Sequence, residues 1–318
     1  TDPASLAWLD QPPSAHLATA RELLQQLGAL DAQGMITPLG RRMVALPLHP
    51  RLSRLLLAAQ EIGQTAAACA LAARLANRST AGRAIEQTVQ QLVRLMGEPG
   101  ERSGGDGSGL LQAFPALAVA AWPDRIAMQR PDGEGRYLLA SGRGALLSPR
   151  AGCTAAPFLV ALQVDGGQGA DGLIHQAVGL SADQVRTCAR HLITGQRAVG
   201  WDTASGRVTA AEQERIGAVV LSSRQVAAND AEAVPLVLEQ IRRHGLGLLG
   251  WNEPARQLQA RAGLAAALLP EEGWPDLSDT ALLDSLESWL GPHLSGIRSI
   301  QGLQNLSIFQ LLQEIIGW

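Results

Sequence analysis

The chain contains no lysine, and all 26 of its basic residues are arginine. This absence excludes a P-loop lysine, Schiff-base chemistry and a Ser-x-x-Lys nucleophile within these 318 residues. A bias toward arginine is typical of a GC-rich genome. The planar guanidinium fork is nevertheless well suited to phosphate contact, so the composition leaves phosphate binding open.

Aromatic residues and cysteines are also scarce. Aromatics make up 3% of a chain that is 46% hydrophobic, so its cores must rest on Leu, Ala and Val. Three scattered cysteines form no disulfide framework, which fits a reducing cytoplasm. No apolar run approaches the roughly 18 residues of a membrane span, and no signal-peptide pattern opens the chain. The net charge of −3 does not indicate a general nucleic-acid binder, although a basic face could be local.

The length predicts two to four domains. Residues 1–63 read as winged-helix-like, with a helix capped by Ser14, a short strand at Met35-Ile36, and a helix from Pro38 to Leu46 that Thr37 caps. Its segments carry apolar residues at helical spacing, namely Leu17, Ala20, Leu24 and Leu27, and then Leu39, Met43 and Leu46. Residues 64–129 read as a shortened helical bundle with a Gly-rich linker at 97–109.

From residue 130 the pattern changes to short β-type runs between Gly, Asp and Ser turns. These runs predict a small barrel of the OB type over 130–226. Residues 227–318 are expected to form a helical C-terminal region, with caps at Asp230, Asn252 and Ser278. Its expected apolar face comprises Leu282, Leu283, Leu286, Trp289 and Leu290. The fold class is therefore α+β and multi-domain.

Patterns that suggest catalysis or metal binding are incomplete. "GQGADG", residues 167–172, matches G-x-G-x-x-G, but a strand-like run follows it, so a hairpin loop is favoured over a dinucleotide site. Cys188 and His191 have metal-like spacing without a second ligand pair. No Gly-x-Ser-x-Gly elbow occurs, and the six histidines are far apart in sequence. We infer no catalytic centre, no metal and no cofactor in this chain.

Arginines are the remaining functional candidates. As a set on the rim of a barrel they predict phosphate contacts, while solvated surface or local ion pairs remain the alternative for each one. Tyr137, the single tyrosine, is a candidate for base stacking or for the core. The helix from Pro38 offers little length for a groove, so its two arginines favour interdomain contacts. The predicted nucleic-acid contacts are Arg125, Arg136, Arg143, Arg207 and Arg215, and the predicted interdomain contacts are Arg41 and Arg42.

A family resemblance rests on several motifs in one order. "LLQQLGALDAQGMITPLGRRMVALPLHPRLSRLLLAA" resembles the segment that follows the motor in DEAH/RHA-type helicases, with its Leu-Gly-Ala-Leu, Thr-Pro-Leu-Gly and Pro-x-x-Pro-Arg-Leu pieces. "WPDRIAMQR", "GRYLLASGRGALL", "WDTASGRVTA" and "RIGAVVLSSR" resemble the HrpB branch of bacterial DExH-box helicases. "GWPDLSD" and "SWLGPHLSGIRSI" are similar to the C-terminal region of that branch.

Departures from the family are equally informative. The chain has no Walker A, no Asp-Glu-x-His box and no arginine-rich motor motif, so Thr1 would fall just past the two RecA-like motor domains. The bundle before Trp122 is shorter than the family pattern, which puts the ratchet-like helix in doubt, and the end at Trp318 comes early.

The resemblance implies a parent ATP-dependent RNA helicase, with ATP and magnesium in the motor. This chain would be its accessory half, closing a channel over single-stranded nucleic acid, taken to be RNA from the family alone. It would couple strand position to the motor domains, with no ATPase activity of its own. The alternative is a motorless scaffold that docks a partner protein through its Leu/Trp-rich C-terminal helices.

Overall fold

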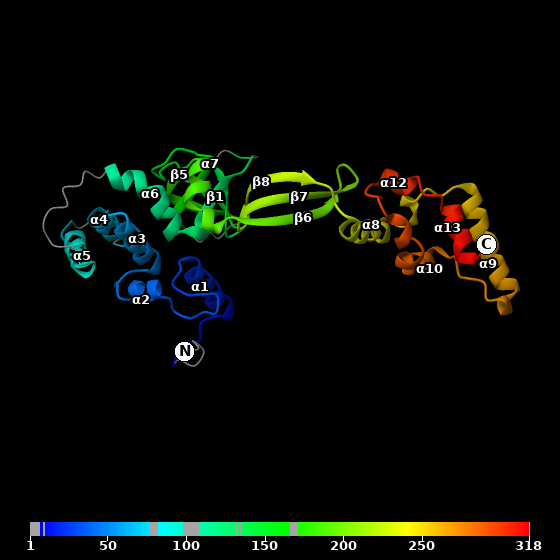
Figure 1. The fold of residues 1–318 in the computed structure, drawn as a ribbon, viewed down its shortest axis with the longest axis horizontal. Coiled ribbons are helices and arrows are strands. Elements are labelled where there is room, and N and C mark those ends of the chain that lie inside the picture. Colours follow the sequence, from blue (N-terminus) through cyan, green and yellow to red (C-terminus); the bar gives the residue numbers. More distant parts are fainter. Residues whose placement is uncertain are drawn as a thin grey trace. The chain divides into compact units, whose positions relative to one another are not determined.

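The computed structural model (Figure 1) describes residues 7–8, 10–76, 82–97, 108–131, 133, 135–165 and 171–317. The chain divides into two compact units. Unit 1 comprises Thr1–Thr194 and Arg215–Leu221, and unit 2 comprises Gly195–Glu214 and Ser222–Trp318. Across the described ranges, no helix combines the length and the apolar character needed to span a membrane.

The first part of unit 1 has the winged-helix pattern of helix, wing and helix. Gly28 has φ of +73° and ends the first helix, and an isolated bridge between Leu30 and Ile36 forms the wing. The Thr37 hydroxyl oxygen accepts a hydrogen bond from the Gly40 N–H at 2.9 Å and donates one to the Gly28 carbonyl at 2.6 Å. The helices are α1 (Ser14–Gln26), α2 (Pro38–Val44) and α3 (Pro50–Glu61).

Thr37 therefore caps α2 with Pro38 at the first helical position, as predicted. The prediction for Ser14 was wrong in detail, because Ser14 is the first helical residue of α1 and Pro13 holds the cap position. Helix α2 also ends at Val44, two residues before the expected Leu46, which is nonetheless buried.

An alanine-rich bundle follows the winged helix. The α3 side chains Leu55 and Ala59 and the α4 side chains Ala68 and Ala72 are fully buried in the core of unit 1. Small residues on α4 allow its backbone to approach α3 closely. Of the predicted linker, residues 98–107 lie outside the described residues, whereas 108–109 begin a helix. The bundle helices are α4 (Thr65–Ala76), α5 (Gly82–Leu95) and α6 (Ser108–Ala121).

A closed five-stranded barrel follows the 3₁₀ turn η2 (Pro123–Arg125). Its order is β1-β2-β3-β5-β4, with β3 and β5 parallel and the other neighbouring pairs antiparallel. The strands are β1 (Ile126–Gln129), β2 (Arg136–Leu139), β3 (Gly144–Leu147), β4 (Phe158–Val164) and β5 (Asp171–Leu180). Helix α7 (Ala182–Cys188) and the turn η3 (Arg190–Leu192) come next.

Tyr137 lies in the core of this barrel and is 0% exposed. Its hydroxyl donates a hydrogen bond to the Ala156 carbonyl at 2.9 Å and accepts one from the Ala156 N–H at 3.2 Å. Base stacking on Tyr137 is therefore excluded in this structure, and its core alternative is the correct one.

The later strands form a separate three-stranded sheet rather than part of the barrel. They are β6 (Thr194–Asp202), β7 (Arg207–Ile216) and β8 (Val219–Val226). The barrel closes through pairing of β1 with β4, which leaves no free edge for another strand. The expectation of one barrel over 130–226 thus differs from the observed pairing, because turns and alternation identify strands but not their partners.

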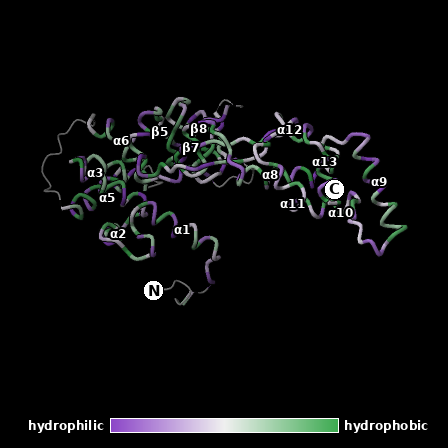
Figure 2. The backbone as a smooth tube through the Cα atoms, turned by 45° about the vertical axis from the view of Figure 1, so that its right-hand side comes forward, coloured by the Kyte–Doolittle hydropathy of each residue, from purple (hydrophilic) through white to green (hydrophobic). Residues whose placement is uncertain are grey.

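Helices make up the rest of unit 2, and hydrophobic and hydrophilic residues alternate along them (Figure 2). Asn252 and Ser278 cap helices as predicted, but Asn229 rather than Asp230 caps α8. Leu282, Leu286, Trp289 and Leu290 are buried in this unit's own core, with Leu283 packed against it, so they offer no docking face. The helices are α8 (Asp230–His244), α9 (Glu253–Leu268), α10 (Asp279–Asp284), α11 (Leu286–Trp289), α12 (Ile300–Gln304) and α13 (Ile308–Ile316).

Candidate nucleic-acid interface

A cavity of 1110 Å³ lies within unit 1 between the winged-helix segment, the end of α4 and the outside of the barrel. We call it the junction groove. It is lined by Leu23, Leu46, Pro47, Leu48, His49, Arg51, Leu52, Arg74, Leu75, Ala76, Trp122, Arg125, Leu162, Gln163 and Gln176. Three of these side chains are arginines and none is a carboxylate. The lining therefore favours an anionic ligand.

Arg51 fixes the junction between the helices and the barrel. Its Nη1 and Nη2 donate to Oδ1 and Oδ2 of Asp124 at 2.6 and 2.9 Å, and Nη1 also reaches the Ala121 carbonyl at 3.3 Å. The Arg51 side chain is only 8% exposed. Such a planar, two-point contact fixes orientation as well as distance, so the groove has a defined shape.

Arg125 lies on the barrel side of the groove. Its Nη1 donates to the Leu162 carbonyl at 3.1 Å. Burial lowers the pKa of Arg125, and the nearby charges of Arg51 and Arg143 lower it further, against the opposing effect of Asp124. Neighbouring cations that disfavour one another's charge indicate a local excess of positive potential.

His49 responds to the same potential. Burial lowers its pKa below 6.5, and the charges of Arg51 and Arg125 act in the same direction. Its ring Nδ1 accepts a hydrogen bond from the Arg51 N–H at 3.3 Å at the start of α3. An anion bound in the groove would reduce the repulsion between the positive charges of Arg51, Arg125 and a protonated His49.

The predicted phosphate contacts are not brought together at one place. Arg125 lines the groove, and Arg143 is close enough to affect its pKa. Arg136 begins β2 and is exposed, as is Arg143 between β2 and β3. Arg207 is exposed at the start of β7 in unit 2, and Arg215 belongs to unit 1, where its Nη2 donates to the Ala218 carbonyl at 3.3 Å. Their role in binding stays a prediction.

Sequence reasoning missed His49 and Arg74 as groove residues. His49 stands two residues before Arg51 in "LPLHPRL", so that motif was the available signal. Arg74 comes from the last turn of α4, and no local pattern distinguishes it from other helical arginines. Only the packing of distant segments places both beside Arg125.

The predicted interdomain residues lie on α2. Arg41 and Arg42 are both exposed, and Arg42 Nη2 donates to Gln60 Oε1 of α3 at 2.6 Å. The contact between Arg42 and Gln60 is within unit 1, so it neither supports nor opposes an interdomain role for Arg42.

Other motifs have ordinary structural positions. Residues 167–170 of "GQGADG" lie outside the described residues, and β5 begins at Asp171, so a strand follows as expected. Burial raises the pKa of the Cys188 thiol, and His191 is exposed. Within the described ranges, no group of three or more potential ligands is placed to hold a metal ion.

Comparison with known proteins identifies the relatives of this fold. Residues 20–48 match the winged-helix model of the helicase associated domain (HA2), and residues 192–226 match the connector region of the ATP-dependent RNA helicase HrpB. The ATP-dependent RNA helicase HrpB of Escherichia coli K12 is 35% identical over 332 aligned residues, which cover all of this chain and 40% of that protein. The chain is homologous to the C-terminal region of HrpB.

Solved structures agree with this homology. A crystal structure of the E. coli DExH-box NTPase HrpB matches the whole chain and 40% of its own length, with 33% identity and a TM-score of 0.60. A more distant relative, the fission-yeast pre-mRNA-splicing factor prp22, is 41% identical over 56 residues, covering 18% of this chain. The predicted resemblance to the region after the motor is thereby confirmed.

The HrpB connector match coincides with the separate sheet. It covers 192–226, the same stretch that forms β6, β7 and β8. The HA2 match covers the wing and α2. The chain spans 40% of the length of E. coli HrpB, so the activity of a whole helicase is a matter for proposal.

Proposed function

We propose that this chain is the accessory half of an HrpB-type ATP-dependent RNA helicase and that the junction groove holds a single strand of RNA. The observation that carries the proposal is the groove itself, which His49, Arg51, Arg74 and Arg125 line without any carboxylate. ATP and magnesium would bind in RecA-like motor domains, and this chain would require no cofactor of its own.

The size of the groove supports a polymeric ligand. At 1110 Å³ it exceeds the range of about 300–1,000 Å³ that is typical of sites for drug-sized ligands. Phosphate contacts supply affinity without reading sequence, which suits a protein that lets a strand pass. Arg143, Arg136 and Arg215 are proposed to extend this contact over the barrel.

The barrel is proposed to be of the OB type. Its closed order β1-β2-β3-β5-β4 with a single parallel pair, β3 with β5, supports this assignment. OB barrels commonly bind single strands through a positively charged groove. The four-part division at 63, 129 and 226 is likewise a proposal about how the parent protein is organised.

Coupling to the motor is proposed to run through α2. Arg41 and Arg42 are exposed on one short helix beside the wing, where the large apolar side chains Met35 and Val44 are 65% and 77% exposed. A mixed apolar and cationic surface of this kind is suited to a protein interface. The purified chain is expected to hydrolyse ATP no faster than background.

Binding of labelled single-stranded RNA to the full chain tests the groove. The double variant Arg74→Gln and Arg125→Gln is expected to weaken binding by about a hundredfold, since each of the two lost charge-assisted contacts costs about 1.5 kcal/mol. Arg190 and Arg243 are exposed arginines outside the groove, so the variant Arg190→Gln and Arg243→Gln is the matched control. Equal affinities of the two double variants would contradict the proposal.

A further inference from the structure

Strand β4 carries a β-bulge on the wall of the junction groove. Ala161 pairs with Ala177, and Gln163 pairs with Gln176, so Leu162 is the extra residue on β4. The carbonyl of Leu162 accepts the hydrogen bond from Arg125 Nη1. Bulges of this kind change the direction of neighbouring side chains and are frequent beside functional sites.

Gln163 and Gln176 are consequently placed together at the groove. They face each other across β4 and β5, both are exposed, and both line the cavity. In the described part of the chain, neither amide has a hydrogen-bond partner in the protein. Each amide therefore offers one acceptor oxygen and two donor hydrogens to a ligand.

Because Gln163 and Gln176 lie beside Arg125, the position of Arg125 determines which part of a bound RNA strand their amides contact. Arg125 is hydrogen-bonded to the carbonyl of Leu162, the bulge residue between Ala161 and Gln163. A nucleotide whose phosphate binds Arg125 would therefore have its sugar next to the bulge. Trp122, the one Phe, Tyr or Trp residue in the lining, is only 4% exposed, and the His49 ring is engaged through Nδ1 with the Arg51 N–H at the start of α3. Contact with the sugar is thus favoured over contact with a stacked base.

We propose that Gln163 and Gln176 select RNA over DNA by hydrogen bonding to ribose 2′-hydroxyl groups of a strand in the junction groove. A 2′-hydroxyl both donates and accepts, and it is present in every ribonucleotide, so it permits discrimination without reading sequence. The inference rests on the proposed function of the groove. It assigns the choice between RNA and DNA to two neutral side chains, while the arginines bind both.

The test compares the full chain with a Gln163→Ala and Gln176→Ala variant on labelled single strands of one mixed sequence, made as RNA and as DNA. The unaltered chain is expected to bind RNA about three- to tenfold more tightly, the range of one or two net hydrogen bonds. The variant is expected to lose most of that ratio through weaker RNA binding, with DNA binding unchanged. Gln90 and Gln91 on α5 are exposed and outside the groove, so their double alanine variant is the control and is expected to keep the ratio.

Three results would overturn the proposal: no preference for RNA in the unaltered chain, an unchanged ratio in the variant, or equal losses on RNA and DNA. The proposal would also be overturned if the glutamine variant lost a preference for one homopolymer over another while its ratio of RNA to DNA affinity stayed the same. The amides would then be reading bases. These outcomes leave the groove itself intact if the Arg74 and Arg125 variant still weakens binding. Failure of that arginine variant contradicts the proposed function separately.

Discussion

Arg51 and Asp124 form a two-point ion pair that joins helix α3 to the start of the barrel, although they are 73 residues apart in sequence. Arg51 comes from the Pro-x-x-Pro-Arg-Leu segment and Asp124 from "WPDR", two motifs that sequence comparison alone leaves unconnected. Each motif therefore supplies one half of a single structural contact at the edge of the junction groove.

Removing one half of this pair is expected to be costly. Asp124→Ala leaves the buried Arg51 guanidinium without its carboxylate, and an uncompensated buried charge destabilises a protein by about 3 kcal/mol. Urea unfolding measures the loss, and hydrogen exchange of α3 and β1 assigns it to unit 1. Glu212 is 51% exposed and pairs with Arg224 on the surface, so Glu212→Ala is the control, with an expected cost below about 1 kcal/mol. A cost for Asp124→Ala no larger than that of the control contradicts this role.

The Thr-Pro-Leu-Gly segment makes a prediction about Gly40. A Cβ atom on Gly40 would lie 2.2 Å from the Ala29 carbonyl oxygen and 2.9 Å from Ile36 Cγ1. Gly40→Ala should therefore displace α2 from the wing and destabilise unit 1 by about 2 kcal/mol, as overpacking does elsewhere. Gly263 lies within α9 with open space around it, so Gly263→Ala is expected to be neutral or slightly stabilising in the same unfolding assay. Similar stabilities for both variants would show that α2 is not packed as described.

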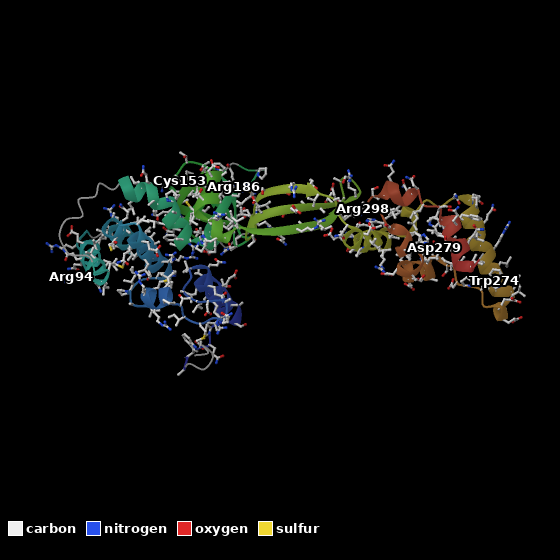
Figure 3. The ribbon with its side chains drawn as sticks, viewed as in Figure 1. Arg94, Cys153, Arg186, Trp274, Asp279 and Arg298 are labelled. Atoms are coloured by element: carbon white, nitrogen blue, oxygen red, sulfur yellow. The ribbon has the colours of Figure 1, made fainter. Side chains whose placement is uncertain are left out.

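Asp230 gives unit 2 a defined dependence on acid. Hydrogen bonds from the Ser295 hydroxyl, the Gly296 N–H and the Arg298 guanidinium lower the pKa of Asp230 to about 2 from its usual 3.8. Arg298 is labelled in Figure 3. A lowered folded-state pKa means that the carboxylate stabilises the fold above about pH 4 and loses this contribution as the pH falls through 2.

Comparing the unfolding of the unaltered chain with Asp230→Asn between pH 7 and pH 1.5 tests this contact. The stability difference between the two proteins should be constant above pH 4 and should vanish near pH 1.5. Asp284→Asn, at an exposed carboxylate on α10, serves as the control and is expected to leave the acid profile as it is. A difference that persists undiminished to pH 1.5 would contradict the contact.

His49 predicts how RNA binding depends on pH. Because its pKa is lowered below 6.5, His49 is neutral at pH 7 and gains a charge only as the pH falls below that value. RNA affinity is expected to rise as the pH falls below 6.5 by more than in His49→Asn, which keeps an N-cap side chain at α3. His16→Asn, at an exposed position on α1, is the control in the same titration. Identical pH profiles for the two variants would exclude His49 from the groove's binding surface.

Local structure was largely predictable from the sequence, and the pairing of segments was not. Thr37 and Pro38 define the start of α2 because capping is decided by neighbouring residues. The buried face at Leu282, Leu286 and Leu290 follows from helical spacing. In contrast, which strands share a sheet depends on closure of the barrel between β1 and β4, which no local pattern encodes.

The candidate site was less predictable for the same reason. Arg125 was identified as one of the arginines expected on the rim of the barrel, whereas Arg74 comes from an ordinary helix end, and Gln163 and Gln176 depend on a bulge in β4. Tyr137 shows the opposite error, since a residue that is capable of stacking is fully buried in the barrel. Composition supplied the candidate residue types, and only tertiary packing selected among them.

The salt dependence of RNA binding tests the central claim most directly. For single strands, each phosphate contact contributes about 0.7 to the slope of log affinity against log salt concentration. The Arg74→Gln and Arg125→Gln variant should therefore reduce the slope by about 1.4 relative to the unaltered chain, while the Arg190→Gln and Arg243→Gln control leaves it in place. An unchanged slope in the groove variant, or the same reduction in the control, would contradict binding of the strand in the junction groove.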